Sequence, residues 1–269
     1  MIERHEFHAM GTTVECLLDG EPGEGFEHVE AEFGRLEALL SRFRPDSELS
    51  RLNADGALEA CPELLRVTRL ALEARERSGG LFDPTVHDAV VAAGYDRSFE
   101  LVPSDGPSAA AGARCGGGIR IEGDRIELEP GTRLDLGGIA KGYTVDRAVE
   151  LLAVHGPCLV NAGGDLAVRG GSWPVGVDGS VTLELTRGAI ATSGRDRRRW
   201  RRGGEELHHL IDPATGRPAE NGLLRVTVVA DSAAEAEVLA KIAFLGGEVD
   251  VPRVLVTADG RTTLAGGLE

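Results

Sequence analysis

Five short apolar segments follow one another between residues 158 and 192, and no helical pattern separates them. They cover residues 158–161, 166–169, 173–177, 181–185 and 189–192, and each has the length of a strand. Helical patterns lie outside this stretch, at residues 25–41, 62–78, 139–154 and 232–244. A doubly wound parallel sheet needs helices that alternate with strands. The pattern therefore predicts an α+β protein with a mixed or antiparallel sheet and packed helices.

Outside this stretch, the sequence predicts a hairpin at residues 119–128 and strands at residues 223–230 and 253–257, the last of which is expected to close the sheet. Residues 103–118 are rich in Ser, Gly, Ala and Pro, so we expect a flexible surface excursion there. No internal repeat or linker divides the 269 residues. We therefore expect residues 1–269 to form a single domain.

Charge and composition exclude several classes of protein. The chain carries 44 acidic and 29 basic residues, a net charge of -15, which argues against general binding to nucleic acid or anionic membranes. An arginine-rich run at residues 195–202 leaves nucleic-acid binding as a remote alternative, although its alternation predicts a solvated hairpin. No apolar run approaches the length of a membrane span. The four cysteines lie far apart and predict no zinc site, so we expect a cytoplasmic protein, with a removed export signal as the alternative.

A glycine turn at residues 134–143, with the sequence LDLGGIAKGY, carries the densest set of unusual residues. It is predicted to be a strand end, a turn and a helix start, where free backbone N–H groups favour an anion. Lys141 would act as a point charge for a phosphate, and Asp135 could bind a base or ribose edge. The alternative is an ordinary turn with a solvated lysine. Lys141 and Lys241 are the only lysines of the chain, and every other basic residue among the 29 is an arginine.

Three other turns are candidates for a functional role. Residues 161–165 (NAGGD) form a second glycine turn with a carboxylate, and residues 209–216 (HLIDPATG) place His209 beside a rigid turn as a possible general base. Residues 82–85 (FDPT) form a third turn, in which Asp83 is expected to cap a helix beginning at Pro84. Taken alone, each turn is a weak signal, and a structural role is favoured for His209.

Taken in order, seven blocks of the sequence resemble the ApbE family, the FAD:protein FMN transferases. The blocks are residues 9–12 (AMGT), 47–53 (SELSRLN), 82–86 (FDPTV), 135–146, 161–165, 191–194 (ATSG) and 209–216. The resemblance implies an α+β domain of the flavin-transferase type that binds FAD. It also implies that the protein uses a divalent metal, usually magnesium, attaches FMN through a phosphoester to a Thr of an acceptor protein, and releases AMP.

The resemblance also implies roles for individual residues. His209 matches the proposed catalytic base, Asp135 and Lys141 match nucleotide-binding residues, and the carbonyl of Gly138 matches a backbone metal ligand. The positions that match flavin or FAD contacts are Met10, Phe43, Ala93, Gly94, Tyr95 and Ile211. Phe43 stands where the family usually has Tyr or Trp, and Ala93 stands where it usually has an aromatic residue.

The chain departs from the family pattern in its last helix, where Glu237 and Lys241 replace a usual Asp and Thr at the metal site. A glutamate can bind magnesium, but an ammonium group repels a cation. One hypothesis is an exposed i, i+4 ion pair worth only about 0.2–0.5 kcal/mol. The other is that Lys241, held by Glu237, has a catalytic role and replaces the charge of the metal. A non-catalytic FAD-binding protein and an FAD pyrophosphatase remain alternatives to the transferase.

Overall fold

An eight-stranded antiparallel sheet forms the centre of the protein in a computed structural model that describes residues 1–109, 112–177, 179 and 181–268. The strand order is β1-β2-β6-β7-β8-β13-β14-β15, and every neighbouring pair is antiparallel. The strands are β1 (Ile2–Ala9), β2 (Thr12–Asp19), β6 (Cys158–Ala162), β7 (Asp165–Gly176), β8 (Thr182–Gly194), β13 (Leu223–Ala230), β14 (Arg253–Thr257) and β15 (Thr262–Ala265). The predicted α+β class with an antiparallel sheet is confirmed.

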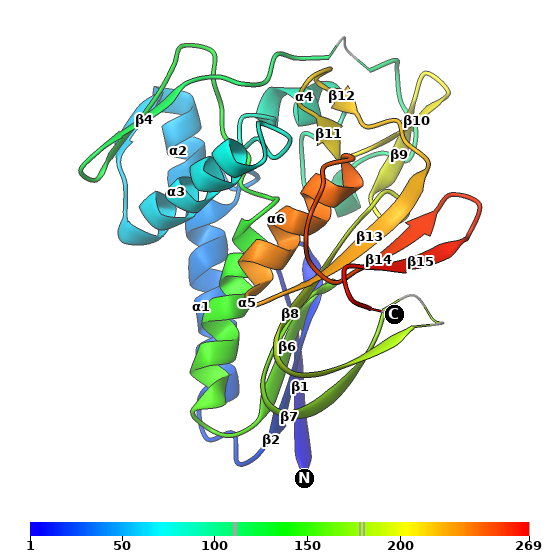
Figure 1. Ribbon diagram of the computed structural model, residues 1–269. Helices are drawn as coiled ribbons and strands as arrows, with labels where there is room; N and C mark the ends of the chain where they lie inside the picture. Colours follow the sequence, from blue (N-terminus) through cyan, green and yellow to red (C-terminus); the bar gives the residue numbers. More distant parts are fainter. Residues whose placement is uncertain (110–111, 178, 180, 269) are drawn as a thin grey trace.

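Three helices pack on one face of this sheet (Figure 1). They are α1 (Gly25–Leu40), α5 (Ala140–Ala153) and α6 (Ala233–Phe244). Their buried side chains, such as Phe33, Val149 and Leu152, meet small residues of the strands such as Ala167 and Ala189. On the opposite face, the long β7–β8 hairpin folds around Trp173, which packs with Leu166, Leu185 and Ile190. The sheet is therefore covered by helices on one side and by its own hairpin on the other.

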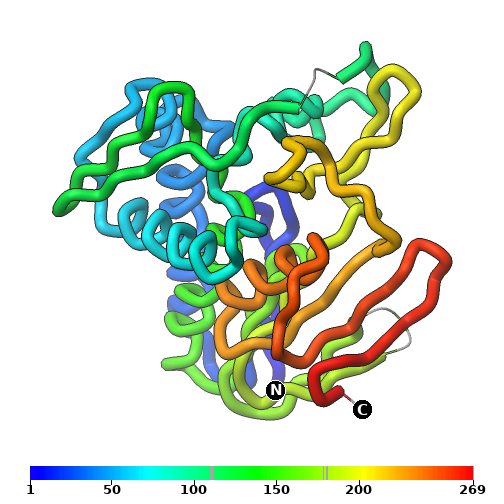
Figure 2. Tube along the Cα trace, turned by 45° about the horizontal axis from the view of Figure 1, so that its top comes forward, coloured from blue at the N-terminus to red at the C-terminus, as the bar shows by residue number. Residues whose placement is uncertain are grey.

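A smaller layer of helices and strands lies beside the sheet (Figure 2). It contains α2 (Glu48–Asp55), α3 (Pro62–Arg77) and a three-stranded sheet of order β3-β5-β4, with β3 (Ala57–Glu59), β4 (Ile119–Glu122) and β5 (Arg125–Leu128). One apolar cluster joins this layer to α5 and α6 through Leu134, Leu136 and Ile139. The segment 134–139 is therefore anchored on both sides.

Several short helices and strands lie beyond one end of the eight-stranded sheet, at the top of Figure 1. They are α4 (His87–Ala92), the 3-10 helix η1 (Phe99–Leu101), the hairpin β9 (Arg199–Arg202) with β10 (Glu205–His208), and the pair β11 (Ile211–Asp212) with β12 (Arg217–Pro218). Their side chains, including Tyr95, Trp200 and Ile211, form a separate apolar cluster.

The structure corrects several predicted boundaries. The five segments between residues 158 and 192 are three strands, because Leu166 to Gly176 and Thr182 to Thr192 continue through a bulge near Arg169. The strand at residues 253–257 does not close the sheet, since β15 lies beyond it. Asp83 caps no helix at Pro84: α4 begins at His87, and the Asp83 carboxylate accepts hydrogen bonds from Thr85 instead. The excursion at residues 103–118 includes residues 110–111, which lie outside the described residues.

The turn between β1 and β2 has an unusual backbone. Ala9 pairs with Thr12, so only Met10 and Gly11 form the turn, with φ values of 50° and 65°. A two-residue hairpin of this type requires positive φ at both central positions. Met10 is the one non-glycine residue with positive φ within the described part of the chain. A strained backbone therefore presents the Met10 side chain to the cavity described next.

Candidate functional site

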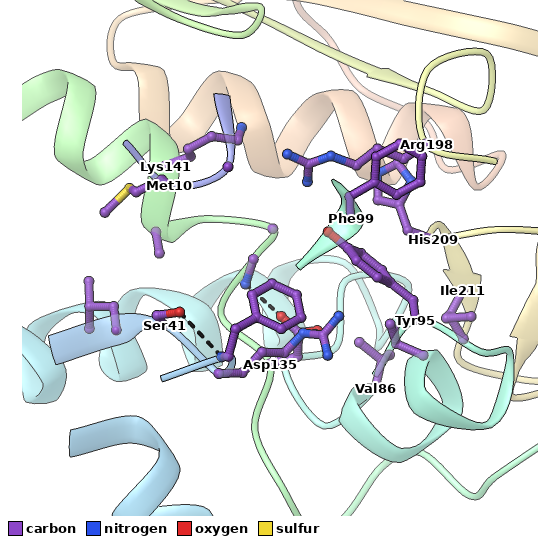
Figure 3. A pocket seen from close by; sticks show the side chains of 18 of the residues that line it. Met10, Ser41, Val86, Tyr95, Phe99, Asp135, Lys141, Arg198, His209 and Ile211 are labelled. Carbon is purple, nitrogen blue, oxygen red and sulfur yellow. Dashed lines mark hydrogen bonds and ion pairs between the residues drawn. The ribbon is translucent and has the colours of Figure 1, made fainter. Parts of the chain in front are cut away.

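A cavity lies where the tip of the β1–β2 hairpin, the start of α5 and the loops after α1 and β10 meet (Figure 3). We call it the first cavity. It brings together most of the predicted site residues: Met10, Phe43, Tyr95, Asp135, Gly138, Lys141, His209, Ile211 and Lys241. Three other predicted site residues, Ala93, Gly94 and Glu237, are not among the described residues that line the first cavity. The Ala93 carbonyl accepts a hydrogen bond from Trp200, and the Gly94 carbonyl accepts one from Arg202. These two residues support the wall from behind.

Aromatic side chains form one wall of the first cavity. Tyr95 lies 5.5 Å from Phe43 and 6.1 Å from Phe99, measured between ring centroids. Arg42 packs its guanidinium over two of these rings, 4.1 Å from the Phe43 centroid and 4.6 Å from that of Tyr95. Flat aromatic faces of this kind can stack against a planar ring system. The wall therefore suits a ligand with a large conjugated ring.

Arg42 also holds the carboxylate of Asp135. Its Nε lies 2.9 Å from Asp135 Oδ2, and the two side chains are only 6% and 11% exposed. Burial alone would raise the pKa of Asp135, but Arg42, the Gly137 N–H group and Lys241 hold that pKa below its usual value. Asp135 is therefore an ionised carboxylate at the bottom of the cavity.

The segment that carries Asp135 is not a strand, so the predicted strand end at this position is wrong. Hydrogen bonds from other parts of the chain fix its backbone instead. Asn53 in α2 binds the backbone of Leu134 on both sides, because its Nδ2 donates to the carbonyl at 2.8 Å and its Oδ1 accepts from the N–H at 2.7 Å. The Asp135 N–H donates to the Pro84 carbonyl at 2.8 Å. Asn53 thus replaces a neighbouring strand, which explains why the block at residues 47–53 belongs to the site.

The predicted anion cradle of free N–H groups is not what the structure contains. The N–H of Gly137 donates to Asp135 at 2.7 Å, that of Ala140 to the Leu136 carbonyl at 2.8 Å, and that of Gly142 to Glu237 at 2.9 Å. The Ile139 N–H group also donates to the Leu136 carbonyl, at 3.0 Å, so four backbone donors between residues 137 and 142 are already used. Positive charge reaches the cavity mainly through side chains.

Both lysines of the chain lie at this point. Lys141 pairs with Asp165 and, at 3.4 Å, with Glu237. Lys241 lies with its Nζ 5.7 Å from the centroid of the Phe82 ring, and a Cβ at position 138 would overlap that Nζ. Burial lowers the pKa of both ammonium groups, although Glu237 opposes this effect. A side chain at position 138 would therefore displace the Lys241 ammonium.

The partners of Glu237 decide between the two hypotheses for the last helix. Glu237 is only 6% exposed, so it does not form a pair on an exposed helix face. Its carboxylate binds Lys141 and the Gly142 N–H group, not the Lys241 ammonium. The hypothesis of an exposed ion pair is therefore wrong. The other hypothesis stays open: Glu237 pairs with Lys141, and its charge also raises the pKa of Lys241.

His209 faces the same region from the loop after β10. Its Nδ1 is buried and has no hydrogen-bond partner among the described residues. Burial, followed by the positive charges of Arg198 and Lys241, lowers the pKa of His209 well below its usual value. The imidazole is therefore neutral at neutral pH, the form in which a histidine can act as a general base.

Sequence reasoning missed Arg42 and Arg198, and it misjudged the arginine run. The run does form the predicted hairpin, but Trp200 is 3% exposed and Arg198 lines the cavity, so the hairpin is not simply solvated. The presence of a tryptophan within the run was the one signal of burial. Nothing in the sequence around Arg42 indicated its contact with Asp135.

A second cavity adjoins the first. It lies over the ends of strands β2, β6, β7, β8 and β13, and its lining includes Thr12, Asn161, Val175, Thr192 and Thr227. Five residues line both cavities: Gly137, Lys141, Arg198, His209 and Lys241. The cationic side chains and the neutral histidine therefore lie at the boundary between two spaces.

The fold and the site together define an α+β protein with a ligand pocket that has an aromatic wall and ends at partly buried cationic groups. Such a pocket suits a ligand that combines a flat ring with an anionic group. The chain belongs to the ApbE family, whose family model matches residues 10–264.

Relatives and solved structures agree with this membership. An FAD:protein FMN transferase of Rhodobacter capsulatus is 33% identical over 96% of this chain and 54% of its own length. One of Treponema pallidum is 30% identical over 78% of this chain and 68% of its own length. The chain thus spans about half the length of the first relative.

The likeness to solved structures covers nearly the whole fold. The ApbE protein of Thermotoga maritima superposes with a TM-score of 0.86 at 24% identity, covering 98% of this chain and 97% of that one. The flavin transferase ApbE of Vibrio cholerae gives a TM-score of 0.77 at 23% identity, with 98% of both chains covered.

Proposed function

We propose that this chain is an FAD:protein FMN transferase, which cleaves the pyrophosphate of FAD and attaches FMN to a Thr of an acceptor protein. The observation that carries the proposal is the meeting of Lys141, Lys241, Arg198 and neutral His209 at the end of an aromatic pocket. Phosphoryl transfer depends on positioning, on charge neutralisation and on a base for the nucleophile. These side chains supply all three.

The aromatic part of the first cavity holds the flavin in this proposal. Phe43 and Tyr95 stack against the ring system, while Met10 and Ile211 contact it from the sides. Asp135 accepts hydrogen bonds from the nucleotide, and Lys141 binds the pyrophosphate. Ala93 and Gly94 act indirectly, by supporting the wall through Trp200 and Arg202.

The transfer step itself needs a hydroxyl and a base. The Thr oxygen attacks the phosphorus on the FMN side, and the bond from that phosphorus to the bridging oxygen breaks. His209 accepts the proton from the hydroxyl, and AMP leaves with the bridging oxygen. The products are the FMN phosphoester and AMP, and the released proton is later lost from His209 to solvent.

A magnesium ion does not fit the residues at the expected metal site. The ammonium of Lys241 lies against Gly138, and Glu237 is already bound by Lys141 and Gly142. No group of three or more His, Cys, Asp or Glu side chains in the described part of the chain could hold a metal ion. We propose that the Lys241 ammonium, whose charged form is favoured by the nearby Glu237 carboxylate, neutralises charge at the pyrophosphate.

The test is to incubate the purified chain with FAD and an acceptor peptide that carries the Thr target motif of the family. AMP release and covalent FMN are followed by mass spectrometry with magnesium and with EDTA. We expect transfer that survives EDTA. Transfer only with magnesium contradicts the role of Lys241, while FAD binding without transfer favours the non-catalytic alternative. AMP and FMN release without peptide modification favours the pyrophosphatase.

A calorimetric measurement tests the metal argument separately from activity. The double variant Glu237→Asp/Lys241→Thr restores the ligand types usual in the family, and it should bind magnesium in the presence of FAD. The single variant Glu237→Asp keeps the ammonium and is the matched control, expected to bind none. Equal magnesium binding by the two variants would refute the argument.

We further propose that the whole chain works as one domain in a reducing compartment such as the cytoplasm, without nucleic-acid partners. The four cysteines are free thiols, and the acidic balance of the chain opposes polyanion binding. No helix in the described residues is long and apolar enough to cross a membrane.

A further inference from the structure

The second cavity has no role in the function proposed so far. Its walls come mainly from the sheet, whereas the first cavity is walled by loops and by the aromatic residues around Tyr95. Met10, Phe43, Tyr95 and Ile211, the proposed direct flavin contacts, line the first cavity, and none of them lines the second. The two spaces meet only at the five shared residues. The second cavity therefore opens to the reacting centre without passing the aromatic wall.

The geometry of phosphoryl transfer gives this arrangement a meaning. The attacking and leaving oxygens lie roughly in line on opposite sides of the phosphorus. If FAD occupies the first cavity, a pyrophosphate beside Lys141 and Lys241 has the flavin and adenylate parts on that side. The nucleophile then needs another route to the phosphorus, and the second cavity leads directly to His209.

The walls of the second cavity suit a polypeptide better than a flat ring. The Thr192 and Thr227 hydroxyls bind each other at 2.8 Å across neighbouring strands, and Val175 and Ile190 add apolar surface. Arg197 donates to the Gly163 carbonyl at 3.2 Å at the rim. No aromatic side chain lines this cavity among the described residues. Carboxylates also line it: Glu6, Glu15, Asp165, Asp196 and Glu237. Mixed hydroxyl, carboxylate, guanidinium and aliphatic groups can bind backbone amides and a small side chain.

We propose that the second cavity is the acceptor port: an extended segment of the acceptor protein enters it and delivers its Thr hydroxyl to His209. This inference rests on the proposed transferase function and identifies where its protein substrate binds. FAD and the acceptor thus bind on two sides of the residues that the cavities share, and the port contributes to the affinity for the acceptor alone.

Blocking the port provides the test. Thr192→Trp places a bulky side chain in the second cavity, and Thr182→Trp is the matched control, because Thr182 is an exposed residue of the same strand outside both cavities. We expect Thr192→Trp to raise the KM for the acceptor peptide by about tenfold or more. The Kd for FAD, measured by flavin fluorescence, should change less than about twofold. Thr192→Ser, which keeps the hydroxyl, should behave like the unmodified chain.

A pair of charge reversals guards against misfolding of the tryptophan variant. Arg197 and Arg199 are both exposed, but only Arg197 lines the second cavity. Arg197→Glu should raise the KM for the acceptor peptide and leave the Kd for FAD unchanged. Arg199→Glu should change neither the KM for the peptide nor the Kd for FAD.

Two results would overturn the port. A parallel loss of FAD affinity in Thr192→Trp and Arg197→Glu would place the adenylate half of FAD in the second cavity. Unchanged KM and unchanged Kd in both variants would mean that the acceptor binds elsewhere. Failure of the unmodified chain to transfer FMN would refute the proposed function itself, and is recognised before any variant is made.

Discussion

Removal of Arg42 should destabilise the free protein through the carboxylate that it leaves behind. The Arg42–Asp135 pair is separated by 2.9 Å and almost fully buried, so Arg42→Met leaves a buried charge without its main partner. Loss of one member of a buried pair costs about 3–5 kcal/mol. The Gly137 N–H group still binds Asp135 at 2.7 Å, and Lys241 still favours its charged form, so we expect a value near the lower limit, about 3 kcal/mol.

The pH dependence of this loss follows from the pKa of Asp135. In the unmodified chain that pKa is lowered, so the stabilisation is complete above the unfolded pKa of about 3.9 and is lost as the pH falls through the lower folded value. Without Arg42, burial dominates and the folded pKa rises above the unfolded one. The variant is then relieved by protonation, and its deficit should shrink between neutral pH and about pH 5.

Urea unfolding at both pH values measures these quantities. Arg44→Met is the matched control, because Arg44 is 48% exposed and pairs with an exposed Asp46, so it should change stability by less than about 0.5 kcal/mol. The double variant Arg42→Met/Asp135→Asn should recover most of the loss, since no buried charge remains. A deficit below about 1 kcal/mol, or one that does not depend on pH, would refute the reasoning.

Three further predictions concern single residues. His209→Gln should slow transfer, measured by single-turnover AMP release, by about 10²–10⁴-fold without changing the Kd for FAD. Because the pKa of His209 is lowered, the transfer rate of the unmodified chain should stay constant as the pH falls through 6.5. Asp146→Ala removes the carboxylate that accepts from the Ala233 and Ala234 N–H groups at 2.7 and 3.0 Å, and should lower the free energy of unfolding by about 1–2 kcal/mol; a thermal midpoint equal to that of the unmodified chain would contradict this. Met10→Gly relieves the positive φ, so the free energy of unfolding should stay the same or rise by up to about 1 kcal/mol while FAD affinity falls; a large loss of stability would show that the Met10 side chain supports the fold.

Local patterns predicted those elements whose sequence periodicity matches their burial. The helix predicted at residues 25–41 is observed as Gly25–Leu40, and the strand predicted at residues 223–230 matches β13. The strands β1 and β2 were not predicted, because charged and histidine residues alternate with Phe7 and Val14 in an edge pair that faces solvent on one side. The edge position of β1 makes such a polar pattern stable, but the sequence alone cannot show which strand lies at the edge.

The site was predicted residue by residue where the family motifs are local, and missed where partners are distant. The turn at residues 134–143 was recognised, but not the use of its N–H groups by Asp135, Leu136 and Glu237. Lys141 and Glu237 are 96 residues apart in the chain, and Arg42 and Asp135 also come from segments that are distant in sequence. Such ion pairs depend on how helices dock, and no spacing in the sequence encodes that.

The contact between α5 and α6 also sets when the site can exist during synthesis. A Cβ at Gly142 would collide with the Ala233 carbonyl, and Asp146 binds the first N–H groups of α6, so the two helices hold each other from both sides. Until the ribosome has released residues 233–244, Asp146 lacks those backbone partners, and Lys141 lacks Glu237. A nascent chain that ends before α6 contains the glycine turn but lacks these contacts. The partners that hold Lys141 and the start of α6 therefore come together only in a chain that is nearly complete.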